Sequence, residues 1–287
     1  MKPLERAWRS LEGLSVGDAF GERFFDLGAE RWIAERAEPA GTWRWTDDTE
    51  MALSIFEQLD VGGGIDQDDL ARAFATRMDP LRGYGRGAFV TLERIERGVH
   101  WRRAAVESFG GMGSWGNGAA MRVAPLGAYF ADDLDRCAEE ARRSAEVTHA
   151  HDEGVAGAIA VAVVAALATR GVPPGEWLSR VRPYLPAGRV RDRVDHAASL
   201  PVATTVRAAA RALGSGLEIA AFDTVPFCLW SAARHADDFR EALWQTVTPP
   251  GDRDTTCAIV GGILGARVPV PEEWRRARER LTYVRIG

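Results

Sequence analysis

The chain has 287 residues, and its 41 acidic residues outnumber its 36 basic residues, which gives a formal net charge of −5. Only one of the basic residues is a lysine, Lys2, and the other 35 are arginines. Schiff-base catalysis, Walker-type phosphate loops and protein kinases each depend on a lysine amine. One lysine next to Met1 does not suit any of them, so the composition excludes these classes. Compositional bias is the simplest account of the missing lysines.

The remaining composition is that of an ordinary globular protein, with 46% hydrophobic and 27% charged residues. Mild acidity gives no general reason to expect nucleic-acid binding. The three cysteines, Cys137, Cys228 and Cys257, are far apart and lack a C-x-x-C spacing, which predicts buried thiols in a reducing compartment. The N-terminal residues lack the apolar segment of a signal peptide. We therefore expect a cytoplasmic protein.

Helical periodicity dominates the sequence. Apolar residues recur at three- and four-residue spacing from Met51 to Leu59, and strand signals are weak. Five further segments have helix-favouring compositions: Leu134–Val147, Val155–Thr169, Val202–Leu213, Phe239–Val247 and Trp274–Leu281. The apolar run Val155–Thr169 is shorter than the roughly 20 residues of a membrane span and is predicted to be a buried core helix. The pattern predicts an all-α protein, with residues 1–287 forming a single compact many-helix domain.

Acidic residues stand directly before the helix predicted near Met51. The segment Trp45-Thr46-Asp47-Asp48-Thr49-Glu50 has good N-cap residues, and acids suit the positive end of the helix dipole. A well-capped helix is therefore one interpretation. However, capping needs only one oxygen, and adjacent aspartates repel each other. Two carboxylates between two hydroxyls also form the hard oxygen ligand set that Mg²⁺, Ca²⁺ or Mn²⁺ prefers.

A second acidic segment repeats this arrangement about 200 residues later. Asp252, Asp254 and Thr255 precede the apolar helix predicted from Ala258 to Leu264, and Gly251 permits an unusual backbone at the turn. The glycines 261, 262 and 265 allow another helix to approach closely. Two helix starts with the same composition indicate that both converge on a shared pair of metal ions, as in many hydrolases.

Two glycine-rich loops and a histidine pair complete the candidate chemistry. The loops are Ser114–Arg122 and Gly83–Gly87, whose bare backbone N–H groups can reach an anion. The segment from Thr148 to Asp152 contains His149 and His151. This i, i+2 spacing does not favour zinc, because such residues do not share a helix face. Ligand contact, helix capping or a buried hydrogen bond is the preferred interpretation.

Taken together, these segments resemble the ADP-ribosylglycohydrolase family, which includes the dinitrogenase reductase-activating glycohydrolases. Six motifs occur in the family's order across most of the chain. They are Gly13-Leu14-Ser15-Val16-Gly17-Asp18-Ala19-Phe20-Gly21, Thr46-Asp47-Asp48-Thr49, Gly83-Tyr84-Gly85-Arg86-Gly87, Gly116-Asn117-Gly118-Ala119-Ala120-Met121-Arg122, Thr148-His149, and Gly251-Asp252-Arg253-Asp254-Thr255 with the following Ala258-Ile259-Val260-Gly261. Each motif alone is modest, whereas the ordered set is specific.

The resemblance implies an all-α fold with a cleft that holds two Mg²⁺ ions, for which Mn²⁺ can substitute. It implies six metal ligands: Thr46, Asp47, Asp48, Asp252, Asp254 and Thr255. It also implies a set of ADP-ribose contacts: Gly85, Phe109, Ser114, Trp115, Gly116, Asn117, Gly118 and His149. The implied reaction is hydrolysis of an N- or O-glycosidic bond at the anomeric carbon of ADP-ribose. Water attacks, and an aspartate, Asp47 or Asp48, acts as the base.

Two positions depart from the family pattern. Family members often carry a glutamate eight residues after the glycine that corresponds to Gly17, and Phe25 stands there in this chain. Glu22 and Asp26 flank that position, and Glu22 is taken as the candidate catalytic replacement, with an ordinary surface position as its alternative. The late motif begins with Pro250 where a glycine is frequent, which changes the turn but leaves the ligands in place.

The sequence therefore predicts a Mg²⁺-dependent ADP-ribosyl hydrolase. The expected partner is an ADP-ribosylated protein, most favourably one modified on arginine, or a small ADP-ribose derivative. No nucleic acid or membrane partner is expected. Two other functions fit parts of the pattern: a catalytically silent ADP-ribose-binding or structural protein, and a dinuclear-metal nucleotide phosphohydrolase.

Overall fold

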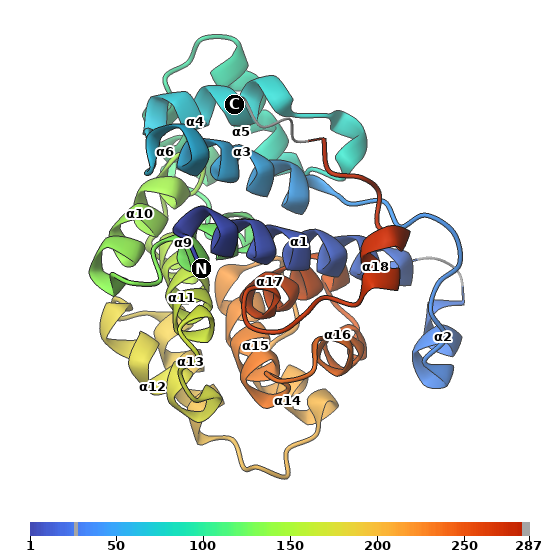
Figure 1. The fold of residues 1–287 in the computed structure, drawn as a ribbon. Coiled ribbons are helices and arrows are strands. Elements are labelled where there is room, and N and C mark those ends of the chain that lie inside the picture. The colour runs from blue at the N-terminus through green and yellow to red at the C-terminus, as the bar shows by residue number, and fades with distance from the viewer. Residues whose placement is uncertain (26–27, 283–287) are drawn as a thin grey trace.

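The computed structural model describes residues 1–25 and 28–282, and over these residues the protein forms eighteen α-helices, four short 3₁₀ helices and no β-strand (Figure 1). The all-α prediction is therefore confirmed. The longer helices are α1 (Pro3–Glu22), α3 (Asp47–Gly62), α4 (Gln67–Arg77), α5 (Arg86–Glu96), α10 (Leu134–Glu146), α11 (Asp152–Thr169), α13 (Arg189–Ser199), α15 (Ala221–Arg234) and α17 (Arg253–Gly265).

The shorter helices connect these long ones and close the ends of the bundle. They are α2 (Ala29–Glu35), α6 (Trp101–Val106), α7 (Ser108–Gly111), α8 (Gly118–Met121), α9 (Ala124–Tyr129), α12 (Trp177–Val181), α14 (Val206–Leu213), α16 (Phe239–Val247) and α18 (Glu272–Ala277). The 3₁₀ helices are η1 (Arg23–Phe25), η2 (Pro80–Arg82), η3 (Pro174–Glu176) and η4 (Arg182–Tyr184). Figure 1 shows α1 crossing the molecule, with α3 to α6 on one side and α15 to α17 on the other.

The predicted helices are present, with some boundaries moved by capping. Helix α3 begins at Asp47 instead of near Met51, because Thr46 is the N-cap and its hydroxyl accepts a hydrogen bond from the Asp48 N–H at 3.4 Å. Its acidic residues therefore form the first helical turn. Helix α14 begins only at Val206, because Thr205 caps it by accepting from the Ala208 N–H at 3.3 Å.

The last predicted helix, Trp274–Leu281, is too long at its C-terminal end. Helix α18 ends at Ala277. The next residues pair with Trp43: its N–H donates to the Ala277 carbonyl at 2.7 Å, and its carbonyl accepts from the Glu279 N–H at 2.8 Å. This contact between distant segments competes with the helical hydrogen bonds, and local composition does not report it.

Helix α11 is the core helix that the sequence predicted. Its residues from Ala156 to Ala168 are almost all buried. Within the described residues it is the one helix long and apolar enough to cross a membrane by length and composition, and 78% of it is buried inside the protein. The three cysteines are also buried, as predicted, and none forms a disulfide.

Helix α1 packs against α17 at backbone distance. A Cβ atom added at Gly13 would lie 2.3 Å from the Gly261 carbonyl oxygen, and one at Gly17 would lie 2.1 Å from that of Cys257. Real Cβ atoms do not approach a carbonyl so closely, so only glycine fits. The prediction that the glycines of α17 admit another helix is thus confirmed. This contact sets Asp18 of α1 beside the acidic start of α17.

We expect Gly17→Ala to lower the free energy of unfolding by about 1–3 kcal/mol or more, because the new methyl group meets backbone that cannot rotate away. Gly62→Ala is the matched control: it lies in a helix and its Cβ would meet nothing within 4 Å, so a change below about 1 kcal/mol is expected. Urea unfolding of both variants measures the difference. Equal stability of the two would contradict the tight α1–α17 contact.

Candidate functional site

Thirteen of the predicted site residues line one cleft of about 440 Å³. They come from the N-terminus of α3, the loop before α5, helix α7, the loop before α8, the segment after α10 and the start of α17. The residues are Asp47, Asp48, Gly85, Phe109, Ser114, Trp115, Gly116, Asn117, Gly118, His149, Asp252, Asp254 and Thr255. Segments up to 200 residues apart thus meet at one cavity, whose size suits a small-molecule ligand.

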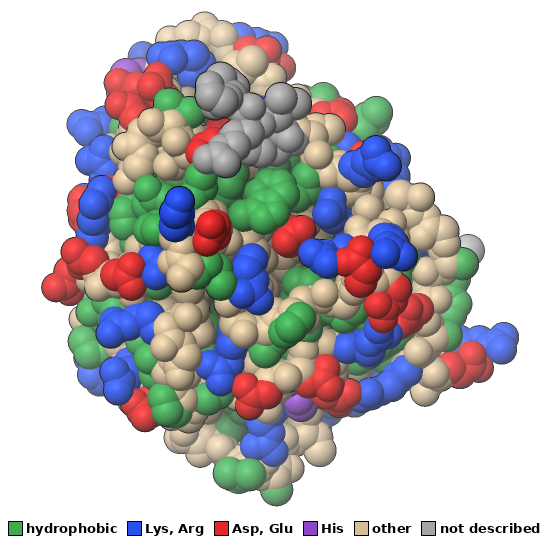
Figure 2. Space-filling model, in the orientation of Figure 1, with side chains coloured by type: hydrophobic (Ala, Val, Ile, Leu, Met, Phe, Trp, Pro, Cys, Tyr) green, Lys and Arg blue, Asp and Glu red, His purple; other side chains and the backbone are tan. Residues whose placement is uncertain are grey.

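A larger hollow of about 720 Å³ lies at the N-terminal end of α1, beside α3. Its lining is mostly apolar and includes Leu4, Trp8 and Phe56. Figure 2 shows hydrophobic side chains gathered between α1 and the helices above it, on a face where acidic and basic side chains are otherwise intermixed. None of the predicted site residues lines this hollow, so the chemistry favours the smaller cleft.

Asp18 anchors the acidic turn at the start of α3. Its carboxylate accepts from the Thr46 N–H at 2.9 Å and hydroxyl at 2.8 Å, and from the Thr49 N–H at 3.1 Å and hydroxyl at 2.5 Å. The side chain is fully buried. The sequence showed Asp18 within the first motif, but it gave no signal that this residue holds the Thr46 turn from another helix.

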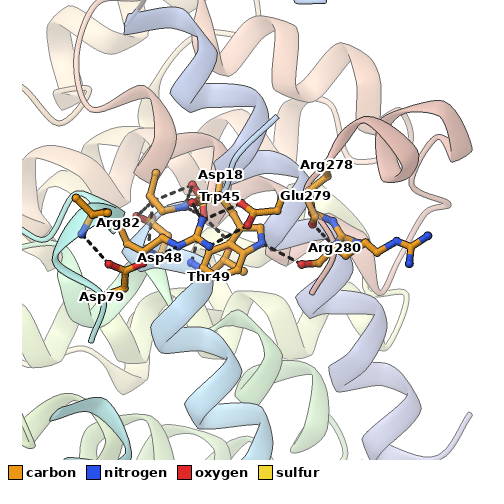
Figure 3. A network of polar contacts seen from close by, with 11 residues as sticks. Asp18, Trp45, Asp48, Thr49, Asp79, Arg82, Arg278, Glu279 and Arg280 are labelled. Atoms are coloured by element: carbon orange, nitrogen blue, oxygen red, sulfur yellow. Dashed lines mark hydrogen bonds and ion pairs between the residues drawn. The ribbon is translucent and has the colours of Figure 1, made fainter. Parts of the chain in front are cut away.

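A second set of contacts holds the same turn from the outside. The Arg82 guanidinium donates to the Trp45 carbonyl at 2.9 Å, lies 3.4 Å from the centroid of its ring, and pairs with both Glu279 carboxylate oxygens at 2.8 and 2.9 Å. Figure 3 shows Asp18, Trp45 and Arg82 in this one network. Because Arg82 adjoins Gly83 of the glycine loop, it ties that loop to the acidic turn.

Asn117 links the glycine loop to the late acidic motif. Its side-chain amide donates to the Asp252 carboxylate at 2.7 Å and to the Thr224 hydroxyl at 3.0 Å. Both amide hydrogens are therefore committed to the protein. Asn117 lines the cleft as predicted, and the structure adds that its side chain orients Asp252.

Gly251 adopts the unusual backbone that the sequence suggested. Its φ angle is +147°, and a Cβ atom there would lie 2.0 Å from the Ser215 carbonyl oxygen. The Ser215 carbonyl in turn accepts from the Asp252 N–H at 3.1 Å. Glycine is required at this position because the two loops touch through their backbones, and this contact fixes where Asp252 begins α17.

The floor of the cleft concentrates negative charge. Burial, together with the nearby Asp18 carboxylate, raises the pKa of Asp47 to about 8 and that of Asp48 well above its usual range. Burial and the neighbouring Asp252 raise the pKa of Asp254 in the same direction. In the described part of the chain, none of these carboxylates forms an ion pair with an arginine, lysine or histidine. Arg122 acts on Asp47 at longer range, but within the described residues no direct ion pair offsets the mutual repulsion of these carboxylates.

Two carboxylate oxygens at the floor have no hydrogen-bond partner although they are buried: Oδ1 of Asp48 and Oδ1 of Asp254. Unmet acceptors among crowded carboxylates and hydroxyls fit a hard divalent cation. Within residues 1–25 and 28–282, no three His, Cys, Asp or Glu side chains already stand in a metal-holding arrangement. The fit to a cation therefore rests on the crowded carboxylates and their two unpaired acceptor oxygens.

Thr46 and Glu22 lie beside the cleft, in a neighbouring pocket of about 140 Å³. The Thr46 hydroxyl is used inside the turn, within 2.8 Å of Asp18 and 3.1 Å of Asp48. Gly83 lines both cavities, so Glu22 stands near the cleft without lining it. Phe25 is 54% exposed. Asp26, the other suggested replacement for the family glutamate, lies outside the described residues.

Aromatic side chains form one wall of the cleft mouth. The rings of Phe109 and Trp115 are 5.2 Å apart, and Trp115 meets His151 at 5.7 Å. Phe109 has a positive φ of 51° and is 47% exposed. A Cβ atom at Gly87 would lie 2.8 Å from the Phe109 ring, so the ring rests on the first turn of α5. This wall offers a flat apolar surface to a planar ligand group.

The N-terminus of α5 lies beside this aromatic wall. Gly85 is the N-cap, no side chain caps the helix, and residues 85–88 all line the cleft. Their N–H groups and the charge of Arg86 form an environment that suits an anion. The prediction of an anion-binding loop at Gly83–Gly87 thus has a matching geometry.

The structure also shows cleft residues that sequence reasoning missed as site residues. Arg122 ended a quoted motif without an assigned role, while Glu218 and Ile219 belong to the loop before α15 and carried no recognisable signal. Ile219 has a φ of +52°, and its carbonyl accepts from the Asn117 N–H at 3.2 Å.

The two histidines of the segment from Thr148 to Asp152 have different places. His151 caps α11 by accepting from the Glu153 N–H at 3.1 Å, and His149 is buried in the cleft.

Comparisons with known proteins show which family the chain resembles. The ADP-ribosylglycohydrolase family profile matches residues 1–286. The ADP-ribosylhydrolase ARH3 of Mus musculus is 30% identical, with 83% of this chain and 74% of the mouse protein covered. The ADP-ribosylarginine hydrolase Tri1 of Pseudomonas putida is 27% identical, with 94% and 73% covered. A solved ADP-ribosylglycohydrolase-related protein complex superposes with a TM-score of 0.71 at 26% identity, covering 97% of this chain and 93% of that one.

We expect the metal-free protein to lose stability as the pH rises from about 5 to about 8. Because the pKa of Asp47 rises from 3.8 to about 8 on folding, the folded state binds more protons in this window, and each such proton contributes about 1.4 kcal/mol per pH unit. Denaturant unfolding in EDTA measures the slope. Asp47→Asn should flatten it, and exposed Asp237→Asn should not. A stability that rises with pH would contradict the buried carboxylate cluster.

Proposed function

The chain belongs to the ADP-ribosylglycohydrolase family, and on that premise we propose that it hydrolyses the bond between ADP-ribose and a protein arginine side chain with the help of two Mg²⁺ ions. Hydrolysis of a glycosidic linkage to ADP-ribose is the chemistry of the family and of its named relatives. The metal requirement and the arginine linkage are the specific parts of the proposal.

The observation that carries the proposal is the buried aspartate cluster at the floor of the cleft. A protein that needed these carboxylates only for folding would pair them with cations or hydrogen-bond donors, because uncompensated buried charge is costly. Asp18 is satisfied in this way by Thr46 and Thr49. The Oδ1 atoms of Asp48 and Asp254 are not, which supports a role for them toward a ligand.

The side chains that would hold the two Mg²⁺ ions are Thr46, Asp47, Asp48, Asp252, Asp254 and Thr255. When bound, the ions would neutralise this charge, position the ribose hydroxyls and stabilise negative charge that develops on oxygen. Asn117 holds Asp252 in place from the other side of the cleft. The proposed metal ligand Asp252 is thus supported by Asn117, which belongs to the glycine loop that also lines the cleft.

The walls suit the other parts of ADP-ribose. The Phe109–Trp115 face accommodates a planar adenine ring. The N-terminus of α5 and the Arg86 side chain suit the diphosphate. With the adenine and the diphosphate placed in this way, the ribose that carries the scissile bond would extend toward the aspartates. The anomeric carbon then lies where a carboxylate can assist attack by water.

In the proposed reaction, Asp47 or Asp48 accepts a proton from the attacking water as its oxygen bonds to the anomeric carbon. The bond from that carbon to the arginine nitrogen breaks with its electron pair going to nitrogen, and the departing guanidine takes up the proton that the carboxylate removed from water. The products are ADP-ribose and unmodified arginine. The raised pKa of Asp47, about 8 in the metal-free cleft, would fall when a cation binds, which leaves a carboxylate able to act as base.

Two observations favour arginine as the acceptor. One relative is named an ADP-ribosylarginine hydrolase. In addition, Phe25 replaces the glutamate that family members often carry near the metals, and arginine-linked substrates can rely on aspartate alone. The same replacement favours a second candidate function, an ADP-ribose-binding protein without turnover. Calorimetry that finds ADP-ribose binding in a protein without hydrolysis would support that candidate.

A hydrolysis panel tests the proposal. Protein or peptide carrying arginine-, serine- or acetyl-linked ADP-ribose is incubated with the enzyme in Mg²⁺, in Mn²⁺ and in EDTA, and released ADP-ribose is measured. We expect the fastest release from arginine in Mg²⁺, a substantial rate in Mn²⁺ and no release in EDTA. Faster release from serine would overturn the arginine assignment alone. No release from any substrate by folded protein would overturn the enzyme, and phosphate release would favour a phosphohydrolase.

Single substitutions separate the acidic residues by role. Asp47→Asn and Asp254→Asn should each lower kcat at least about 100-fold. Both should keep or raise the free energy of unfolding, because each removes a buried repulsive charge. Asp237→Asn, at an exposed ion pair with Arg267, is the matched control and should keep full activity. Glu22→Gln in the same assay tests the predicted catalytic role of Glu22, for which a loss of kcat with unchanged stability is expected.

A further inference from the structure

His149 lies in the cleft with one ring nitrogen unused. The residue is 5% exposed and lines the cavity. Its Nε2 atom faces the glycine loop, because Cβ atoms added at Gly118 and Gly116 would lie 3.2 and 3.4 Å from it. Over the described residues, the hydrogen bond made by this ring is at the other nitrogen, Nδ1. Nε2 is thus available to a ligand in the cleft that His149 lines.

The other nitrogen, Nδ1, belongs to a buried relay. It lies 2.8 Å from the Thr148 hydroxyl. That hydroxyl accepts a hydrogen bond from the guanidinium of Arg122 at 2.9 Å. Arg122 is fully buried, and the same nitrogen donates to the Ser144 carbonyl at 3.1 Å. Because a guanidinium can only donate, the Thr148 oxygen must be the acceptor in its bond with Arg122.

Counting protons along the relay fixes the state of the imidazole. The Thr148 hydroxyl has one hydrogen, and Nδ1 of His149 is the acceptor it contacts in the described structure. If Nδ1 also carried a proton, the hydroxyl hydrogen would be buried without an acceptor, which is unfavourable. Nδ1 therefore accepts, and the proton of the neutral ring resides on Nε2.

The charge around the ring agrees with this geometry. Burial and the nearby Arg122 guanidinium lower the pKa of His149 to about 3. Burial lowers the pKa of Arg122 only to about 9, so at neutral pH the arginine keeps its charge and the imidazole stays neutral. A neutral ring with one free N–H recognises a hydrogen-bond acceptor without adding a cation to the cleft.

We propose that Arg122 and Thr148 are positioning residues that fix His149 as its neutral Nε2–H tautomer, and that this N–H donates to an acceptor oxygen of ADP-ribose. The inference rests on the proposed function for the identity of the ligand. The tautomer itself is a property of the free protein. The glycines at 116 and 118 are part of the arrangement, since a side chain there would crowd the ring.

The first experiment reads the tautomer directly. The full chain is labelled with ¹⁵N-histidine, and two-bond ¹H–¹⁵N correlations assign the protonated nitrogen of each ring. The protein has five histidines, and the spectrum of His149→Gln identifies the signal of His149. An Nε2–H tautomer in wild type, lost or mixed in Thr148→Val, is expected. A protonated Nδ1 in wild type would overturn the proposal, even if the valine variant did not fold.

The second experiment measures affinity for ADP-ribose by calorimetry in Mg²⁺. Thr148→Val, which keeps the shape but removes the hydroxyl, should weaken binding about tenfold, the effect of one hydrogen bond. Thr148→Ser should restore the affinity to within about twofold. Thr246→Val is the matched control: its hydroxyl is buried and hydrogen-bonded to Ser231 and Ala242, so it should lose stability without losing affinity.

The outcomes separate this inference from the proposed function. If wild type binds ADP-ribose and Thr148→Val binds it equally well, the relay is overturned and the function stands. If wild type fails to bind ADP-ribose while showing the Nε2–H tautomer, the proposed function and the ligand part of this inference are overturned together. Tenfold weaker binding in the valine variant, with rescue by serine, supports both.

Discussion

The contact between the backbones of α1 and α17 is the constraint on which the site depends. Glycines at 13, 17 and 21 let the two helices meet through their backbones. Asp18 therefore reaches the start of α3 from within α1, and the acidic start of α17 stands beside it. Because the helices touch through rigid backbone, the acidic turns are held together with little freedom to move away from one another.

Holding carboxylates together creates an electrostatic problem that the protein solves in two ways. Asp18 receives hydrogen bonds from two threonines and serves the fold. Asp48 and Asp254 keep buried oxygens without partners, and their pKa values are raised by burial and by neighbouring carboxylates, among them Asp18 and Asp252. The first arrangement stabilises the turn. The second leaves acceptor oxygens without partners, which the proposed metal-dependent hydrolysis would use.

The rest of the cleft is preorganised by polar groups that are committed to one orientation. Asn117 uses both amide hydrogens on Asp252 and Thr224, and Arg82 ties the glycine loop to the Trp45 backbone. The hydrogen bonds from Arg122 through Thr148 to His149 act in the same way, because they fix the Nε2–H donor of His149 toward the cavity. Such fixed groups lower the reorganisation needed when the substrate binds, and this is the main way in which a protein scaffold assists electrostatic catalysis.

The sequence by itself determined the helical class, the two acidic helix starts and the glycine loops. These features are local: apolar spacing, N-cap residues and glycine runs act within a few residues. Tertiary structure alone decided the anchoring role of Asp18, the entry of Glu218 and Ile219 into the cleft, and the end of α18 at Ala277. Each of these depends on contacts between segments far apart in the chain, whose partners no local pattern identifies.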